Sequence, residues 1–76
     1  MFFLKAANLK KILDHKHLTH REFAQQLGIS RGYLGRLLHR ERHLTPKMRQ
    51  ALLRCPCLRG VPESELWEYL EAGGER

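Results

Sequence analysis

Apolar residues recur three or four positions apart along most of the chain, which is the spacing of amphipathic helices. The first such run predicts a helix over about residues 4–15, which Lys16 and His17 end with positive charge at its C-terminus. No segment alternates apolar and polar residues with the period of two expected of a half-buried strand. The 76 residues are therefore expected to form an all-α fold, a compact bundle of about five short helices in a single domain, 1–76.

A second helix is predicted over about residues 20–27. Thr19 and Glu22 have the spacing of a capping box, in which each side chain accepts a hydrogen bond from the backbone of the other residue. Gly28 is expected to end the helix, because glycine adopts the left-handed conformation of a helix end at the lowest cost. Only three residues, 28–30, separate this helix from the next, which Ser30 begins as its N-cap and which reaches about residue 39.

Two further helices are predicted in the second half of the chain. Thr45 and Pro46 supply a cap and a first helical residue for a helix that Pro56 interrupts. Its core-facing residues are expected to be Met48, Ala51 and Leu52, with Leu53 as a further candidate. After a tight loop, Pro62 opens a last helix over about residues 63–72, which Gly73 and Gly74 end.

Two helices joined by a three-residue turn with a glycine form a helix-turn-helix unit, here over about residues 20–39. Each key position has a distinct physical role. Ala24 is small where the two helices cross, Gly28 makes the turn, and Ile29 fills the space beneath it. Leu34 and Leu37 hold the second helix against the first. Together these residues predict a rigid pair of helices whose second member presents its polar face to solvent.

The segment from Phe23 to Leu34, FAQQLGISRGYL, resembles the phage repressor and Cro family, also called XRE-like regulators. The resemblance covers about residues 5–54. It implies a fold like the DNA-binding domain of phage repressors, in which the second helix of the motif lies in the major groove of double-stranded DNA. The expected function is sequence-specific transcriptional regulation, with a repressor as the expected type; activator and repressor are not distinguished by the sequence.

The resemblance also implies which residues meet the DNA. Those expected at base edges are Arg31, Gly32, Tyr33, Gly35, Arg36 and His39. Arg31 is the first candidate, because arginine can donate two hydrogen bonds to guanine O6 and N7. Two glycines on an exposed helical face suggest a close approach of the backbone to the groove. Those expected at phosphates are His20, Arg21 and Ser30 near the motif's start, and Arg40, Arg42, His43, Thr45 and Lys47 after the recognition helix.

The charge distribution agrees with a polyanionic partner. The net charge is +6, but residues 1–60 carry 13 Lys and Arg against 3 acidic residues, whereas residues 61–76 carry one Arg against five Glu. A positive body of this kind attracts nucleic acid. The acidic last helix, with Trp67 and Tyr69, leaves open a protein–protein adaptor on a helix-turn-helix scaffold. A DNA-binding antitoxin and a restriction-modification controller also remain open.

A homodimer is expected, because one short helix contacts only about four or five base pairs. The expected interface is the last helix and its preceding loop, through Leu58, Val61, Leu66, Trp67 and Leu70. The alternative for Leu66 and Trp67 is that they complete the core of the monomer. Phe2 and Phe3 are a second possible interface.

Other classes of function find little support. There is no glycine-rich phosphate loop and no nucleophile motif, so neither an enzyme nor a cofactor is expected. The histidines, among them His39 and His43 four residues apart, lack the partners of a zinc site, and no metal is expected. Cys55 and Cys57 are expected to be reduced thiols at a helix end. No small-molecule effector, no membrane association and a cytoplasmic location, at the nucleoid of a prokaryote or phage host, complete the expectations.

Overall fold

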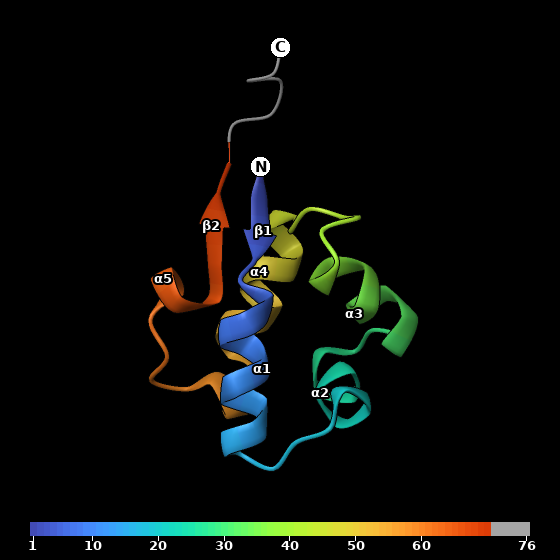
Figure 1. The fold of residues 1–76 in the computed structure, drawn as a ribbon, viewed down its shortest axis with the longest axis vertical. Helices are drawn as coiled ribbons and strands as arrows, with labels where there is room; N and C mark the ends of the chain where they lie inside the picture. Colours follow the sequence, from blue (N-terminus) through green and yellow to red (C-terminus); the bar gives the residue numbers. More distant parts are fainter. Residues whose placement is uncertain (71–76) are drawn as a thin grey trace.

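The computed structural model of the protein describes residues 1–70, and it arranges them as helices closed by a small terminal sheet (Figure 1). The helices are α1 (Ala6–His15), α2 (His20–Leu27), α3 (Arg31–Leu38), α4 (Pro46–Arg54) and α5 (Glu63–Leu66). A single 3-10 turn, η1 (Pro56–Leu58), follows α4, and two strands, β1 (Phe2–Leu4) and β2 (Trp67–Tyr69), pair at the chain ends. The fold is all-α with a helix-turn-helix, as predicted.

The predicted helix boundaries around the motif are confirmed by their caps. Thr19 Oγ1 accepts a hydrogen bond from the Glu22 amide at 3.1 Å, and the Thr19 amide donates to Glu22 Oε1 at 2.9 Å. Gly28 has a φ of +75°, the left-handed conformation that ends α2. Ser30 Oγ accepts from the Tyr33 amide at 3.0 Å and thereby begins α3. These local hydrogen bonds set where α2 and α3 begin, and Gly28 sets where α2 ends.

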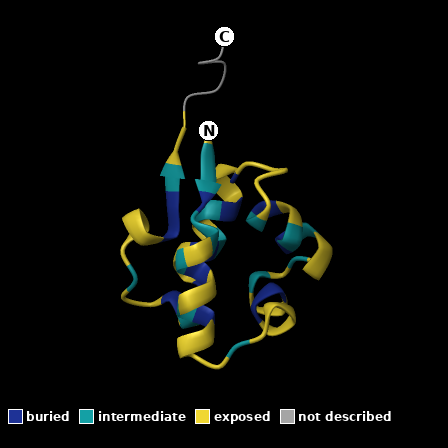
Figure 2. Cartoon of the chain, viewed as in Figure 1, coloured by how far each residue is buried: buried dark blue, intermediate teal, exposed yellow. Residues whose placement is uncertain are grey.

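The core lies where all five helices and both strands meet (Figure 2). Ala24 is 2% exposed and Leu34 and Leu37 are each 1% exposed, so the inward face of the motif is the predicted one. The other buried residues come from every part of the chain and are Leu4, Leu9, Leu13, Phe23, Leu44, Met48, Leu52, Cys55, Leu58, Leu66 and Trp67. Ile29 is partly buried and packs against this cluster, in agreement with its predicted place beneath the turn.

The predicted last helix over residues 63–72 is wrong. α5 is a single turn that stops at Leu66, and the chain then becomes extended as β2; residues 71 and 72 lie outside the described residues. β2 pairs antiparallel with β1 in the register Phe2 with Tyr69, Phe3 with Glu68 and Leu4 with Trp67. This pairing brings together two segments more than 60 residues apart, and strands of three residues are too short to show a period of two.

Two smaller expectations are also corrected. The first helix begins at Ala6 rather than residue 4, because residues 2–4 belong to β1. Leu53 does not face the core: it is 50% exposed on the outer side of α4. Within residues 1–70, none of the helices has both the length and the apolar character that crossing a membrane demands.

Candidate nucleic-acid interface

The outer face of α3 is polar and open to solvent. Arg31, Gly32 and Arg36 are exposed, as is His39 at the C-cap, whereas Tyr33 and Gly35 are partly covered. Leu34 and Leu37 are buried, and Tyr33 and Leu38 are partly buried and pack against the core. None of the exposed positions of α3 carries a large apolar side chain. A protein-binding face would be expected to present such apolar anchors. The surface therefore has the composition of a groove-reading helix.

The N-termini of α2 and α3 open onto a common hollow. Its volume is about 470 Å³, and it is lined by Thr19, His20, Arg21 and Arg31. The threonine and serine caps satisfy the third amide of each helix, through Glu22 in α2 and Tyr33 in α3. The first amides of a helix have no intrahelical acceptor, and the helix dipole places positive potential there. Two arginines and two helix N-termini thus concentrate positive charge at one place on the surface.

The two glycines of α3 have no structural reason within the chain to be glycine. A Cβ atom on Gly32 would come no closer than 4.0 Å to Ser30 Oγ, and one on Gly35 would meet nothing within 4 Å. Neither has a positive φ. An alanine would fit at both positions and would favour the helix. The exposed surface between Arg31 and Arg36 is therefore kept free of side chains although the fold does not require it.

The basic residues after α3 divide into two groups. Arg42, His43 and Lys47 are exposed, as predicted for side chains that face phosphates, and Thr45 caps α4 by accepting from the Met48 amide at 3.2 Å. Arg40 is different, because its guanidinium donates to a Glu68 carboxylate oxygen on β2 and lies 5.8 Å from the centre of the Phe3 ring. No local pattern in the sequence indicates this ion pair, because 28 positions separate the two residues.

Comparison with known proteins agrees with this geometry. A family model described as "Helix-turn-helix" matches residues 9–55, which is more than half of the chain. The chain belongs to the helix-turn-helix family, in its phage repressor and Cro-like, XRE form. Neither a curated protein nor a solved structure matches it. The matched segment of this helix-turn-helix protein includes α2, α3 and α4, and the family function is DNA binding in transcription regulation.

The predicted dimer interface is only partly at the surface. Leu58, Leu66 and Trp67 are 4%, 1% and 7% exposed within the single chain, which corrects their assignment to an interface. They complete the core because β2 turns back against β1 instead of continuing as a helix. Leu70 is 40% exposed, and Val61 is partly buried. Phe2 and Phe3 are partly covered in β1, Phe2 by the Tyr69 ring at 5.1 Å between centroids.

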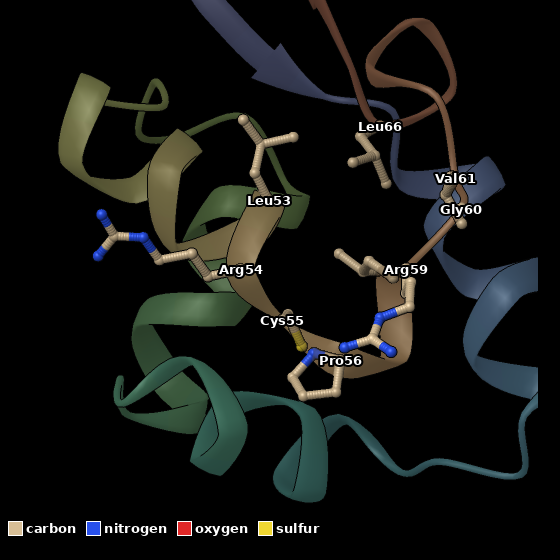
Figure 3. A pocket seen from close by; sticks show the side chains of 9 residues that line it. Leu53, Arg54, Cys55, Pro56, Arg59, Gly60, Val61 and Leu66 are labelled. Carbon is tan, nitrogen blue, oxygen red and sulfur yellow. The ribbon is translucent and has the colours of Figure 1, made fainter.

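A second hollow lies on the surface beside the turn between α4 and α5 (Figure 3). Its volume is about 380 Å³, and Leu53 and Leu66 stand on opposite sides of it. Its rim is charged, with Arg54 and Arg59 contributed by α4 and the turn after η1. The half-exposed Leu53 thus stands beside a hollow with both apolar and basic lining residues, which the sequence does not predict because it makes Leu53 a candidate for the core.

The two cysteines are free thiols with their sulfurs 2.9 Å apart. Cys55 is buried, and its thiol donates to Gln26 Oε1 of α2 at 3.3 Å. Burial, together with the hydrogen bond to the Cys55 thiol, raises the pKa of the Cys57 thiol to about 12. The Cys55 thiol therefore links the end of α4 to α2, and Cys57 packs against it. Across residues 1–70, no three His, Cys, Asp or Glu side chains gather as a metal site would require.

Proposed function

We propose that this helix-turn-helix protein is a sequence-specific repressor that inserts α3 into the major groove of double-stranded DNA as a homodimer. The observation that carries the proposal is the outer face of α3, where Arg31 and Arg36 flank a surface kept open by two glycines. An arginine at this position can reach guanine O6 and N7 once the helix backbone lies deep in the groove. Glycine in place of a larger residue at positions 32 and 35, on the face between the two arginines, permits that depth.

Phosphate contacts orient the helix in this proposal. The hollow at the N-termini of α2 and α3 receives one phosphate, held by Arg21 and by the free amides at the start of each helix. Arg42, His43 and Lys47 reach the backbone on the other side of the groove. Such contacts fix the register of the helix but carry no sequence information. Sequence discrimination thus depends on the few side chains of α3.

The homodimer follows from the small size of that reading surface. One short helix specifies too few base pairs for a unique site, whereas two copies related by a two-fold axis read half-sites about 34 Å apart. The face with the second hollow suits a second copy of the chain, because a protruding Leu53 stands beside a recess lined by both apolar and basic side chains. Arg54 and Arg59 supply positive charge there, and Glu63, exposed at the start of α5, supplies negative charge two residues after Val61 of the lining. An isologous contact needs such self-complementarity.

DNA binding is tested by the salt dependence of affinity for mixed genomic duplexes, followed by selection of bound sequences from random DNA. We expect the association constant to fall steeply as salt rises, because bound phosphates release counterions. Two variants with the same charge change localise the interface. Arg31→Gln should weaken binding to selected sites about 5- to 150-fold, through loss of about 1–3 kcal/mol of base contact. The control Lys10→Gln, which removes the same charge from an exposed residue of α1, should bind like the wild type. Equal effects of the two variants would refute a reading role for α3.

The dimer is tested by sedimentation at micromolar concentration with and without a selected duplex. Leu53→Glu should leave a folded monomer that binds a single half-site. Leu70→Glu, which changes a leucine that is 40% exposed directly after β2, should leave the dimer intact. Dissociation by Leu70→Glu alone would place the interface at the sheet, and a wild-type monomer on DNA would overturn the dimer.

A further inference from the structure

The ion pair between Arg40 and Glu68 joins the DNA-facing part of the molecule to the acidic end of the chain. Arg40 follows the C-cap of α3 directly and precedes the exposed basic residues Arg42 and His43. Glu68 lies in the middle of β2, opposite Phe3 of β1. Its carboxylate accepts from the Arg40 guanidinium, which also lies over the Phe3 ring. One of the predicted phosphate-binding side chains is therefore occupied by an internal anion.

The backbone at Arg40 indicates that the side chain matters at this position. Its φ is +62°, in the left-handed region that side chains with a Cβ atom enter at a cost. Glycine or asparagine would relieve that cost at a helix end. A strained residue that persists where a simpler one would suffice points to a role beyond the turn itself.

Arg49 of α4, a second arginine that contacts the terminal sheet of β1 and β2, provides a contrast. Its guanidinium carbon lies 4.0 Å from the centre of the Phe2 ring, it donates to the Leu44 carbonyl oxygen at 3.0 Å, and it is partly buried. It serves the packing of the terminal sheet against α4. Arg40 instead has its side chain 44% exposed and Glu68 has its side chain 37% exposed. Exposed ion pairs of this kind are weak and are screened by salt, so an external anion can compete for either partner.

We propose that Glu68 is an internal competitor of DNA phosphate for Arg40. This inference rests on the proposed DNA-binding function and adds a regulatory contact to the same surface. In the free protein, the carboxylate holds the Arg40 guanidinium against the terminal sheet and neutralises the positive charge of Arg40. While this pair persists, Arg40 makes no phosphate contact, and it gains one only when Glu68 releases the guanidinium. The acidic end of the chain thus limits non-specific affinity, which depends on the number of free cations.

The test compares Glu68→Gln with Glu65→Gln, which removes the same charge from an exposed residue three positions away. Both are measured on one mixed genomic duplex over a range of salt concentrations. Glu68→Gln should raise affinity at low salt about two- to fivefold over Glu65→Gln. It should also steepen the slope of log K against log salt by about 0.9, as expected for one additional phosphate contact. A purely structural role for Glu68 would lower the melting temperature but would not change this slope.

Substitution of Arg40 supplies the second arm of the test. It remains informative even when the substitution of Glu68 weakens the terminal sheet. Arg40→Gln alone should change the salt slope little, because the side chain is already neutralised by Glu68. In the Glu68→Gln background, Arg40→Gln should abolish the gain in affinity and in slope. Equal affinities and slopes for Glu68→Gln and Glu65→Gln, while the wild type binds DNA, would overturn this inference alone. Failure of the wild type to bind any duplex would overturn both this inference and the proposed function.

Discussion

The helix-turn-helix unit, residues 19–39, and the terminal sheet formed by β1 and β2 contribute to the molecule in opposite ways. The unit is held by local hydrogen bonds at Thr19, Gly28 and Ser30, and it leaves its outer face polar. The terminal sheet is held by pairing across more than 60 residues and buries Leu4 and Trp67 in the core. The part of the chain proposed to read DNA is thus shaped by short-range rules, whereas the part that completes the core is decided by long-range contacts.

This difference separates stability from recognition. The terminal sheet of β1 and β2 does not cover the outer face of α3. Within residues 1–70 it contacts the loop after α3 through Arg40 and through the Leu44 amide, which donates to the Phe2 carbonyl oxygen at 2.7 Å. Substitutions at buried residues of the terminal sheet should therefore reduce stability without altering the outer face of α3. Substitutions on that outer face should alter DNA binding without reducing stability. The following predictions test whether the two regions are as independent as this comparison implies.

The largest expected effect is on stability, from Trp67→Ala. Removing this side chain, which is 7% exposed, should cost about 3–5 kcal/mol of unfolding free energy because of lost apolar burial and the cavity that remains. The control is Tyr69→Ala in the same strand, which is 61% exposed and should cost much less. Urea denaturation followed by circular dichroism measures both. Similar losses of unfolding free energy for the two variants would mean that the terminal sheet does not complete the core.

The next effect concerns the crossing of α2 and α3. Ala24→Leu should destabilise the protein by about 1–3 kcal/mol, because a larger side chain overpacks a site that is 2% exposed. Gln25→Leu, one position along on the exposed side of α2, introduces the same side chain without this cost. Thermal unfolding distinguishes them. A neutral Ala24→Leu would show that the two helices are less closely packed than the structure indicates.

A smaller effect of opposite sign is expected from Gly32→Ala. It should stabilise the free protein by about 0.5–1 kcal/mol, because alanine favours the helix and meets no neighbour. It should also weaken DNA binding, because a methyl group then lies between α3 and the groove. Gly60→Ala, at a φ of +84°, should instead destabilise the protein and leave the affinity of the folded protein unchanged. Unchanged or improved DNA affinity for Gly32→Ala would contradict the close approach.

The smallest effect is that of the Cys57 thiol on pH dependence. Its pKa is raised to about 12 in the folded protein from an ordinary value of 9.0. The folded state therefore holds this proton more tightly than the unfolded state. Its contribution to stability is complete below pH 9 and is lost as pH rises towards 12. Alkylation at pH 9–10 should be slower for Cys57 in the native protein than after denaturation, as mass spectrometry of the labelled chain would show. Equal rates would contradict the raised pKa.

The positions that the sequence predicted correctly share a physical character. A capping box, a glycine helix end and a serine cap each depend on residues no more than three or four apart, so their geometry follows from local hydrogen bonding. His17 illustrates this at finer scale, because the predicted end of α1 there is confirmed and the residue has a φ of +58°. The inward set of Ala24, Leu34 and Leu37 followed from helical periodicity alone.

The predictions that failed all depend on contacts distant in sequence. Trp67 and Tyr69 are apolar residues at positions compatible with a helix. Only the pairing of residues 67–69 with residues 2–4 makes this segment a strand. The same pairing buried Leu66 and Trp67, which removed them from the predicted interface, and placed Glu68 beside Arg40. The exposure of Leu53 likewise follows from how α4 lies against the other helices rather than from its own periodicity.

The sequence by itself determined the helix-turn-helix unit, its orientation and its basic surface, because these follow from caps, spacing and charge within short windows. Only the tertiary structure decided how the chain ends close the core and which arginine is already engaged by an acid. Those outcomes depend on pairing free energies between segments that no local pattern connects, and a three-residue strand carries too little pattern to predict its partner.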